Sequence, residues 1–380
     1  MPSDRPPRTL IWFWGTGGAG VRYATRVAER IAEQHSPANV ALALHEGNAW
    51  IERSRQRGHP VVTVGGAHGY RAALKIALQA PRRWLALRRL IAEFRPDVAV
   101  IPMSFALAWP YVLAFSLRNI PVVYVAHDDK PHAGDYMTLF QAKMQALLLR
   151  QATCVVAMSG YVAGQLRTSG SLRADQRCEV IPLTAHDVAR RAEPRRRSPG
   201  PISFLFLGRL LGYKGLSLMA DALEPLKDHT GWRLTIAGNG PEAETVRAAF
   251  SRFPQVELSH IRWLDEAEVD ALIRSHDVLI SPYLEASQSG VVSEALYDAM
   301  PCLVTPVGAL PEQIGFGKAG WVAPEASTKG LTRTITGLLE DPTSIESRSA
   351  GALDIARSGP TDAWGRLVRD LARERGPPSN

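Results

Sequence analysis

Cysteine is scarce in this chain of 380 residues, which contains only three. Cys154, Cys178 and Cys302 are odd in number and scattered, so they suit neither a disulfide framework nor a metal cluster. Scattered cysteines of this kind are typical of a reducing compartment. We therefore expect no cysteine-bound metal.

Long hydrophobic runs are also absent. No run of about 18 or more apolar residues lacks a charge, so the sequence predicts no transmembrane helix. The apolar stretch near the N-terminus is short and leads directly into glycines without a cleavage site, so we expect no signal peptide. These absences favour a cytoplasmic protein, with peripheral contact to the inner face of the cell membrane as a further hypothesis.

What the chain does contain is a globular composition, with 46% hydrophobic and 21% charged residues. Its length is too great for one ordinary core and suits two domains. Short apolar segments alternate with helix-length segments, and helical crossovers join parallel strands. We expect strands at Leu10–Trp14, Val40–His45, Val61–Val64, Asp97–Pro102, Val122–Ala126, Cys154–Met158, Ser203–Leu207, Arg233–Ala237, Val278–Ser281 and Cys302–Thr305.

The alternation is interrupted once, at the arginine- and proline-rich stretch Arg190–Pro201. The sequence therefore predicts an α/β fold with two Rossmann-like parallel-sheet domains that face each other across a cleft. We place the first domain at 1–190, a linker at 191–201 and the second domain at 202–360. A final helix and tail at 361–380 can cross back to the first domain.

Charge is unevenly distributed along the chain. Residues through Arg197 carry 27 Lys and Arg against 14 Asp and Glu, whereas the remainder carries 17 against 23. A basic half predicts an anionic partner, although a basic surface without a partner is the alternative. No recognition motif accompanies the charge, so we expect no nucleic-acid partner.

One basic helical segment suits anionic lipid headgroups. An ordinary surface helix with a core-facing stripe is an equal alternative. The segment, Arg71–Phe94, combines an apolar stripe at helical spacing, Trp84, Leu87, Ile91 and Phe94, with Arg82, Arg83, Arg88, Arg89 and the nearby Lys75.

A glycine loop, Gly15–Gly20, reads G-x-G-x-x-G directly after the first expected strand. Such glycines let the backbone approach a phosphate at a helix N-terminus. Glu46 follows the second strand, where a dinucleotide-binding domain keeps its ribose-binding acid, so an NAD-dependent dehydrogenase is one interpretation. A tight strand-to-helix turn without a ligand is the other interpretation of the glycine loop. The motifs in the second half of the chain distinguish between the two.

Motifs follow four strands of the second half. Arg209 and Lys214 bracket the loop that begins at Gly208, and two cations near a helix N-terminus suit a pyrophosphate. A carboxylate one turn into a helix, such as Glu294, can accept two ribose hydroxyls. The other candidates for ligand contact are Gly238, Asn239, Trp263, Leu264, Ser289, Gly290 and Val291.

The motifs GRLLGYKG, AGNGPE and SQSGVVSEALYDAMPCLVTPVGALPE, in this order, resemble the family 4 glycosyltransferases of the GT-B fold. By this resemblance, Arg209 and Lys214 bind the donor diphosphate and Glu294 binds the ribose. Amides of Ser289, Gly290 and Val291 contact the donor sugar and phosphate. The glycine loop, through Gly17 and Gly18, faces the donor phosphates and the acceptor.

The first glutamate of the family's pair departs from the pattern. Seven residues usually separate the two glutamates, whereas eight separate Glu285 from Glu294 here, and the loop between them reads ASQSG. Glu285 is therefore a weaker assignment for the donor-sugar contact than Glu294 is for the ribose.

His127 and Asp128 follow the strand Val122–Ala126, where the family carries a similar segment that lines the donor sugar and acceptor. A buried histidine bound to a backbone carbonyl is the alternative. No Asp-x-Asp motif is present, so we expect no metal and no other cofactor, with Arg209 and Lys214 carrying the charge of the leaving group.

The resemblance implies a retaining hexosyltransferase. The acceptor hydroxyl attacks on the face from which the diphosphate departs. A UDP- or GDP-sugar is the expected donor, and a glycan or lipid-linked hydroxyl the expected acceptor in surface polysaccharide or glycolipid synthesis. A nucleotide-sugar 2-epimerase and a non-catalytic binder of sugar nucleotides are the remaining alternatives.

Overall fold

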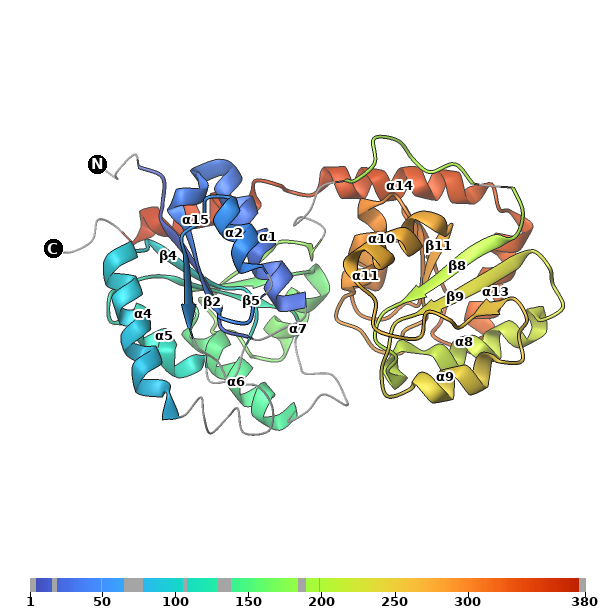
Figure 1. Cartoon of the computed structure of the whole chain (residues 1–380), viewed down its shortest axis with the longest axis horizontal. Coiled ribbons are helices and arrows are strands. Elements are labelled where there is room, and N and C mark those ends of the chain that lie inside the picture. The colour runs from blue at the N-terminus through green and yellow to red at the C-terminus, as the bar shows by residue number, and fades with distance from the viewer. Residues whose placement is uncertain are drawn as a thin grey trace. The chain divides into compact units, whose positions relative to one another are not determined.

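The computed structural model describes residues 5–15, 19–48, 50–64, 78–104, 108–128, 138–183, 189–197 and 199–375. The chain forms two compact units (Figure 1). The first comprises Met1–Ile181 together with Pro360–Asn380, and the second comprises Pro182–Gly359. No helix in the described ranges is long and apolar enough to span a bilayer.

The first unit contains a parallel sheet in the order β3-β2-β1-β4-β5-β6-β7. Its central strands are buried on both faces because helices cover the sheet, which explains their continuous apolar sequences. The elements are β1 (Thr9–Phe13), α1 (Ala19–His35), η1 (Pro37–Asn39), β2 (Val40–His45), α2 (Ile51–Gln56), β3 (Val61–Val64), α4 (Ala80–Phe94), β4 (Val98–Ile101), α5 (Trp109–Ser116), β5 (Val122–Ala126), α6 (Thr138–Gln151), β6 (Cys154–Ala157), α7 (Gly160–Thr168), β7 (Arg177–Val180) and α15 (Ala363–Glu374).

The last helix, α15, belongs to the first unit and packs against α1, so helices from opposite ends of the sequence lie side by side (Figure 1). Its contact face contains Gly365, whose carbonyl oxygen lies 3.2 Å from Nε2 of His35. A Cβ on Gly365 would lie 2.1 Å from Oε1 of Gln34, so the glycine permits this close approach.

The second unit repeats the architecture, with a parallel sheet in the order β10-β9-β8-β11-β12-β13. The predicted class of two Rossmann-like α/β domains is therefore confirmed. The elements are β8 (Ile202–Leu207), η3 (Gly212–Lys214), α8 (Leu216–Leu223), η4 (Glu224–Leu226), β9 (Trp232–Ala237), α9 (Ala243–Phe250), β10 (Val256–Glu257), α10 (Glu266–Ser275), β11 (Val278–Ser281), α11 (Gly290–Tyr297), β12 (Cys302–Val304), α12 (Leu310–Gln313), β13 (Gly320–Val322), α13 (Thr328–Glu340) and α14 (Ser344–Ser358).

The stretch predicted as a linker, 191–201, packs against the second unit. Arg195 is only 8% exposed, and its guanidinium donates to the backbone oxygens of Asp298, Ile273 and His276. Arg191 also approaches Asp298, at 3.7 Å. The arginines of this stretch, whose composition is typical of a solvated linker, therefore form ion pairs and hydrogen bonds within the second unit.

The basic helix α4 uses its apolar stripe for the core of the first unit. Leu87, Ile91 and Phe94 are buried, and Trp84 packs against the same core. Arg83 is buried as well, with its guanidinium 5.8 Å from the Trp14 ring centroid. The stripe is therefore not a lipid-facing surface.

Candidate functional site

The strand order of the second unit reverses between β8 and β11, which are neighbours in the sheet. In open parallel sheets, ligands bind beyond the carboxyl ends of the strands at such a reversal. The loop after β8 carries Arg209 and Lys214, and the loop after β11 leads to α11 and Glu294. The topology thus brings the main motifs of the second half to one end of one sheet.

Lys214, at the end of η3, is placed by aromatic rings. Its Nζ lies 3.7 Å from the ring centroid of Tyr283 and 5.0 Å from that of Tyr213. Such cation–π contacts orient an ammonium group without neutralising its charge. Within residues 199–375 and the other described ranges, neither Lys214 nor the exposed Arg209 makes an ion pair with a carboxylate. Both charges therefore remain available to an anion.

The loop after β8 is tied to its two neighbours by glycines. Gly215 has a φ of +72°, and a Cβ there would lie 1.9 Å from the Pro282 oxygen in the loop after β11. Gly238 has a φ of +127°, and a Cβ there would lie 1.9 Å from the Gly208 oxygen. The adjacent residue Asn239 accepts a backbone hydrogen bond from Leu210 at 3.0 Å. The loops that follow β8, β9 and β11 therefore pack closely against one another.

The N-terminus of α11 is fixed by side chains from within the unit. The Ser289 hydroxyl caps the helix by accepting from the Val292 amide at 3.4 Å. Gln313 accepts from the Ser289 amide at 2.8 Å and donates to the Ser289 carbonyl at 3.1 Å. The Ser289 amide is therefore already occupied.

The backbone amides of Gly290 and Val291 also lie at the N-terminus of α11. A Cβ on Gly290 would meet nothing within 4 Å. The amides of Gly290 and Val291 make no hydrogen bond within the described part of the chain. Of the three amides expected to contact the donor, these two are the ones that the structure leaves accessible.

Glu294 lies on α11 one turn after Gly290, and its side chain is 15% exposed. Oε2 forms an ion pair with the guanidinium of Arg190, which also lies 3.3 Å from Oδ1 of Asp270. Arg190 could not be predicted from the sequence, because a position in an Arg/Pro-rich stretch carries no signal of its partner.

The remaining candidates of this unit are less enclosed. Glu285 is exposed on the loop after β11. Trp263 is 73% exposed, so it is not a core residue, and the neighbouring Leu264 packs against the core. Trp263 therefore remains available for stacking.

In the first unit, His127 and Asp128 follow β5. Nε2 of His127 lies 2.8 Å from the Pro102 carbonyl, so this nitrogen carries the proton and donates. Burial lowers the pKa of His127, which keeps the ring neutral near pH 7. A contact of this kind is the alternative raised for His127 on sequence grounds. Gly17 and Gly18 lie outside the described residues.

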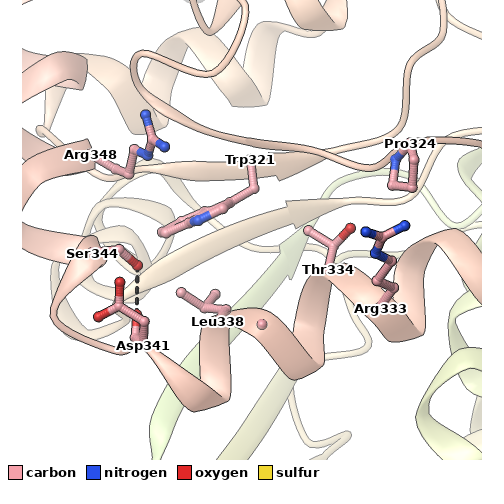
Figure 2. Close-up of a pocket in the computed structure, with 9 residues that line it drawn as sticks. Trp321, Pro324, Arg333, Thr334, Leu338, Asp341, Ser344 and Arg348 are labelled. Carbon is pink, nitrogen blue, oxygen red and sulfur yellow. Dashed lines mark hydrogen bonds between the residues drawn. The ribbon is translucent and has the colours of Figure 1, made fainter.

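A cavity of about 480 Å³ lies between β13, α13 and α14 of the second unit (Figure 2). The Trp321 ring forms one wall above Leu338, and Ser344 donates to the Asp341 carbonyl at 2.6 Å. None of the predicted donor-binding residues lines this cavity. Within the described residues, no cluster of three or more His, Cys, Asp or Glu suits a metal ion.

Two family models match the chain. The one described as glycosyl transferases group 1 covers residues 201–341, and the one described as glycosyl transferase 4-like domain covers residues 17–184. Together they span most of both units.

Known proteins agree with this assignment. The chain is 24% identical over 282 residues to the glycogen synthase of Mycobacterium tuberculosis, covering 71% of this chain and 67% of that protein. It is 25% identical over 311 residues to the D-rhamnosyltransferase WbpZ of Pseudomonas aeruginosa, covering 77% and 78%. The solved structure of HepE from Anabaena with UDP and glucose has a TM-score of 0.72 at 15% identity, covering 97% of this chain and 100% of HepE.

The fold and the family models together define a glycosyltransferase with the GT-B fold. More narrowly, the chain belongs to family 4 of these enzymes. The resemblance stated from the motifs is thereby confirmed, and the dehydrogenase interpretation of the glycine loop is wrong.

Proposed function

We propose that this enzyme transfers a hexose from a UDP- or GDP-sugar to a hydroxyl of a glycan or lipid-linked acceptor. The observation that carries the proposal is the pair of cations, Arg209 and Lys214, at the strand reversal without a carboxylate partner among the described residues. A nucleoside diphosphate brings the negative charge that such a pair would bind. Glu294 would accept the ribose hydroxyls.

Three further assignments belong to this proposal. The two cations take the place of a metal in stabilising the departing diphosphate, and the reaction retains the anomeric configuration. His127 and Asp128 contribute to the donor-sugar and acceptor side, and Glu285 contacts the sugar hydroxyls. The named relatives, a glycogen synthase and a rhamnosyltransferase, support a polysaccharide or glycolipid product.

Nucleotide binding gives a direct test. UDP or GDP at 100 times its Kd should stabilise the protein by about 2.7 kcal/mol. For a unit of this size, each kcal/mol of stabilisation raises the Tm by about 2–4 °C. We expect the shift to be the same with EDTA and with magnesium, and to be lost in Glu294→Ala.

The matched control is Glu340→Ala, which removes an exposed helical acid outside the predicted site. It should keep the full shift. A shift that requires magnesium would contradict the metal-independent mechanism. No shift with either nucleotide would remove the proposed function.

We further propose that the first unit contacts an anionic membrane surface through α4 and α5, which pack side by side (Figure 1). Leu85 of α4 and Leu113 of α5 are exposed, and Arg82 and Arg89 share the exposed face of α4 with Leu85. Exposed leucines beside arginines suit the boundary between headgroups and acyl chains. The unit's 26 Lys and Arg against 15 Asp and Glu add long-range attraction.

Sedimentation with vesicles containing anionic phosphatidylglycerol tests this surface. Arg82→Glu with Arg89→Glu should weaken binding at least about ten-fold, since each basic residue near the surface contributes about 1 kcal/mol. Arg53→Glu with Arg55→Glu makes the same charge change on the exposed face of α2 and should weaken binding less. Equal losses in both variants would contradict a specific surface.

A further inference from the structure

Arg190 connects the two helices beside the predicted ribose site. Its guanidinium pairs with Oε2 of Glu294 on α11 and approaches Oδ1 of Asp270 on α10 at 3.3 Å. Because two carboxylates bind different nitrogens of one planar group, the orientation of that group is defined by both.

The backbone of Arg190 is anchored to the same helix as Glu294. Its amide donates to the Tyr297 carbonyl at 2.6 Å, and its Cζ lies 5.9 Å from the Tyr297 ring centroid. Tyr297 is fully buried, and its hydroxyl donates to the Leu183 carbonyl at 3.0 Å. Arg190 is therefore held by a backbone contact as well as by its ion pairs, which distinguishes it from a freely moving surface arginine.

We propose that Arg190 is a positioning residue that holds the Glu294 carboxylate in the orientation that binds the ribose of the donor. This inference rests on the proposed role of Glu294. A glutamate side chain loses rotamer freedom when it binds a ligand, and a carboxylate oriented beforehand avoids part of that cost. A carboxylate offers about four acceptor sites, so one guanidinium does not displace two hydroxyls.

The experiment measures binding of UDP and GDP by calorimetry to the full chain. Arg190→Ala should weaken binding of the nucleotide that the enzyme uses by about ten-fold, the size expected for coupling between groups in contact. Arg190→Lys should restore part of the loss, because an ammonium keeps the charge but not the two-armed geometry. Arg191→Ala is the matched control, since Arg191 is the next residue and pairs with Asp298 instead.

Two comparisons separate positioning from general structural support. The loss caused by Arg190→Ala should vanish with the 2′,3′-dideoxy nucleotide, which lacks the hydroxyls that Glu294 would bind. It should also vanish in a Glu294→Ala background, where no carboxylate remains to be oriented. In steady state, the donor KM should rise more than kcat falls, with the acceptor KM unchanged.

Other results would contradict either the positioning role of Arg190 or the proposed ribose-binding role of Glu294. Tighter binding in Arg190→Ala would mean that the guanidinium competes with the ribose, which contradicts positioning. An equal loss with the dideoxy nucleotide would assign Arg190 a structural role. Unchanged nucleotide binding in Glu294→Ala would instead overturn the proposed function, independently of how Arg190→Ala behaves.

Discussion

Lys214→Ala is expected to lower kcat by about 10²–10³-fold, the loss seen when one preorganised group that stabilises developing charge is removed. The physical reason lies in the environment of the Lys214 ammonium group. It lies against Tyr283 and Tyr213 and has no carboxylate partner among the described residues, so its charge is not neutralised there and can act on a bound diphosphate. The measurement is single-turnover release of nucleoside diphosphate from the donor sugar.

We expect the Lys214→Ala substitution to affect kcat more than the donor KM. Negative charge on the diphosphate increases as the glycosidic bond breaks, so the cation contributes more in the transition state than in the ground state. Donor KM should therefore change less than kcat. Lys329→Ala, which removes an exposed lysine on α13, should leave both unchanged. A loss confined to KM would mean that Lys214 only binds the donor.

The buried strands could be located closely from the sequence. The expected bounds of β2, β5 and β11 match the structure, because each is an apolar run that helices cover on both faces. The edge strand β3 was also located with the expected bounds, because it is still an apolar run, whereas the opposite edge strand was missed. Arg177–Val180, which forms β7, is partly exposed and carries two charged residues, so it has no apolar pattern.

The candidate site could be predicted in outline because its motifs are local. Glycines, cations and a helical carboxylate follow consecutive strands, and the parallel topology brings the ends of those strands together. Their partners are not local. Gln313 binds the Ser289 amide from 24 residues away, and Arg190 binds Glu294 from 104 residues away. Only tertiary packing selects such partners, so the sequence contained no signal for them.

The largest stability loss is expected for a residue in the stretch predicted as a linker. Arg195→Ala should destabilise the second unit by about 3–5 kcal/mol, because it removes the nearer arginine partner of a buried charge and, among the described residues, leaves only the more exposed Arg191 beside it. That charge is Asp298, which is buried and lies 3.2 Å from the guanidinium. The backbone oxygens of Ile273 and His276 also lose their donor, at 2.8 Å each. Arg195→Met, which keeps most of the volume, should not rescue the loss.

The neighbouring arginine provides the control for this prediction. Arg196 is exposed and makes no ion pair within the described residues, so Arg196→Ala should change the free energy of unfolding by less than about 0.5 kcal/mol. Because two units can unfold separately, calorimetry should follow the transition that the bound nucleotide shifts. Equal effects of the two variants would mean that the stretch behaves as a solvated linker. A loss of stability in Arg195→Ala alone would mean that the arginines of this stretch differ in their contribution because they differ in burial. The composition of the stretch does not reveal that difference.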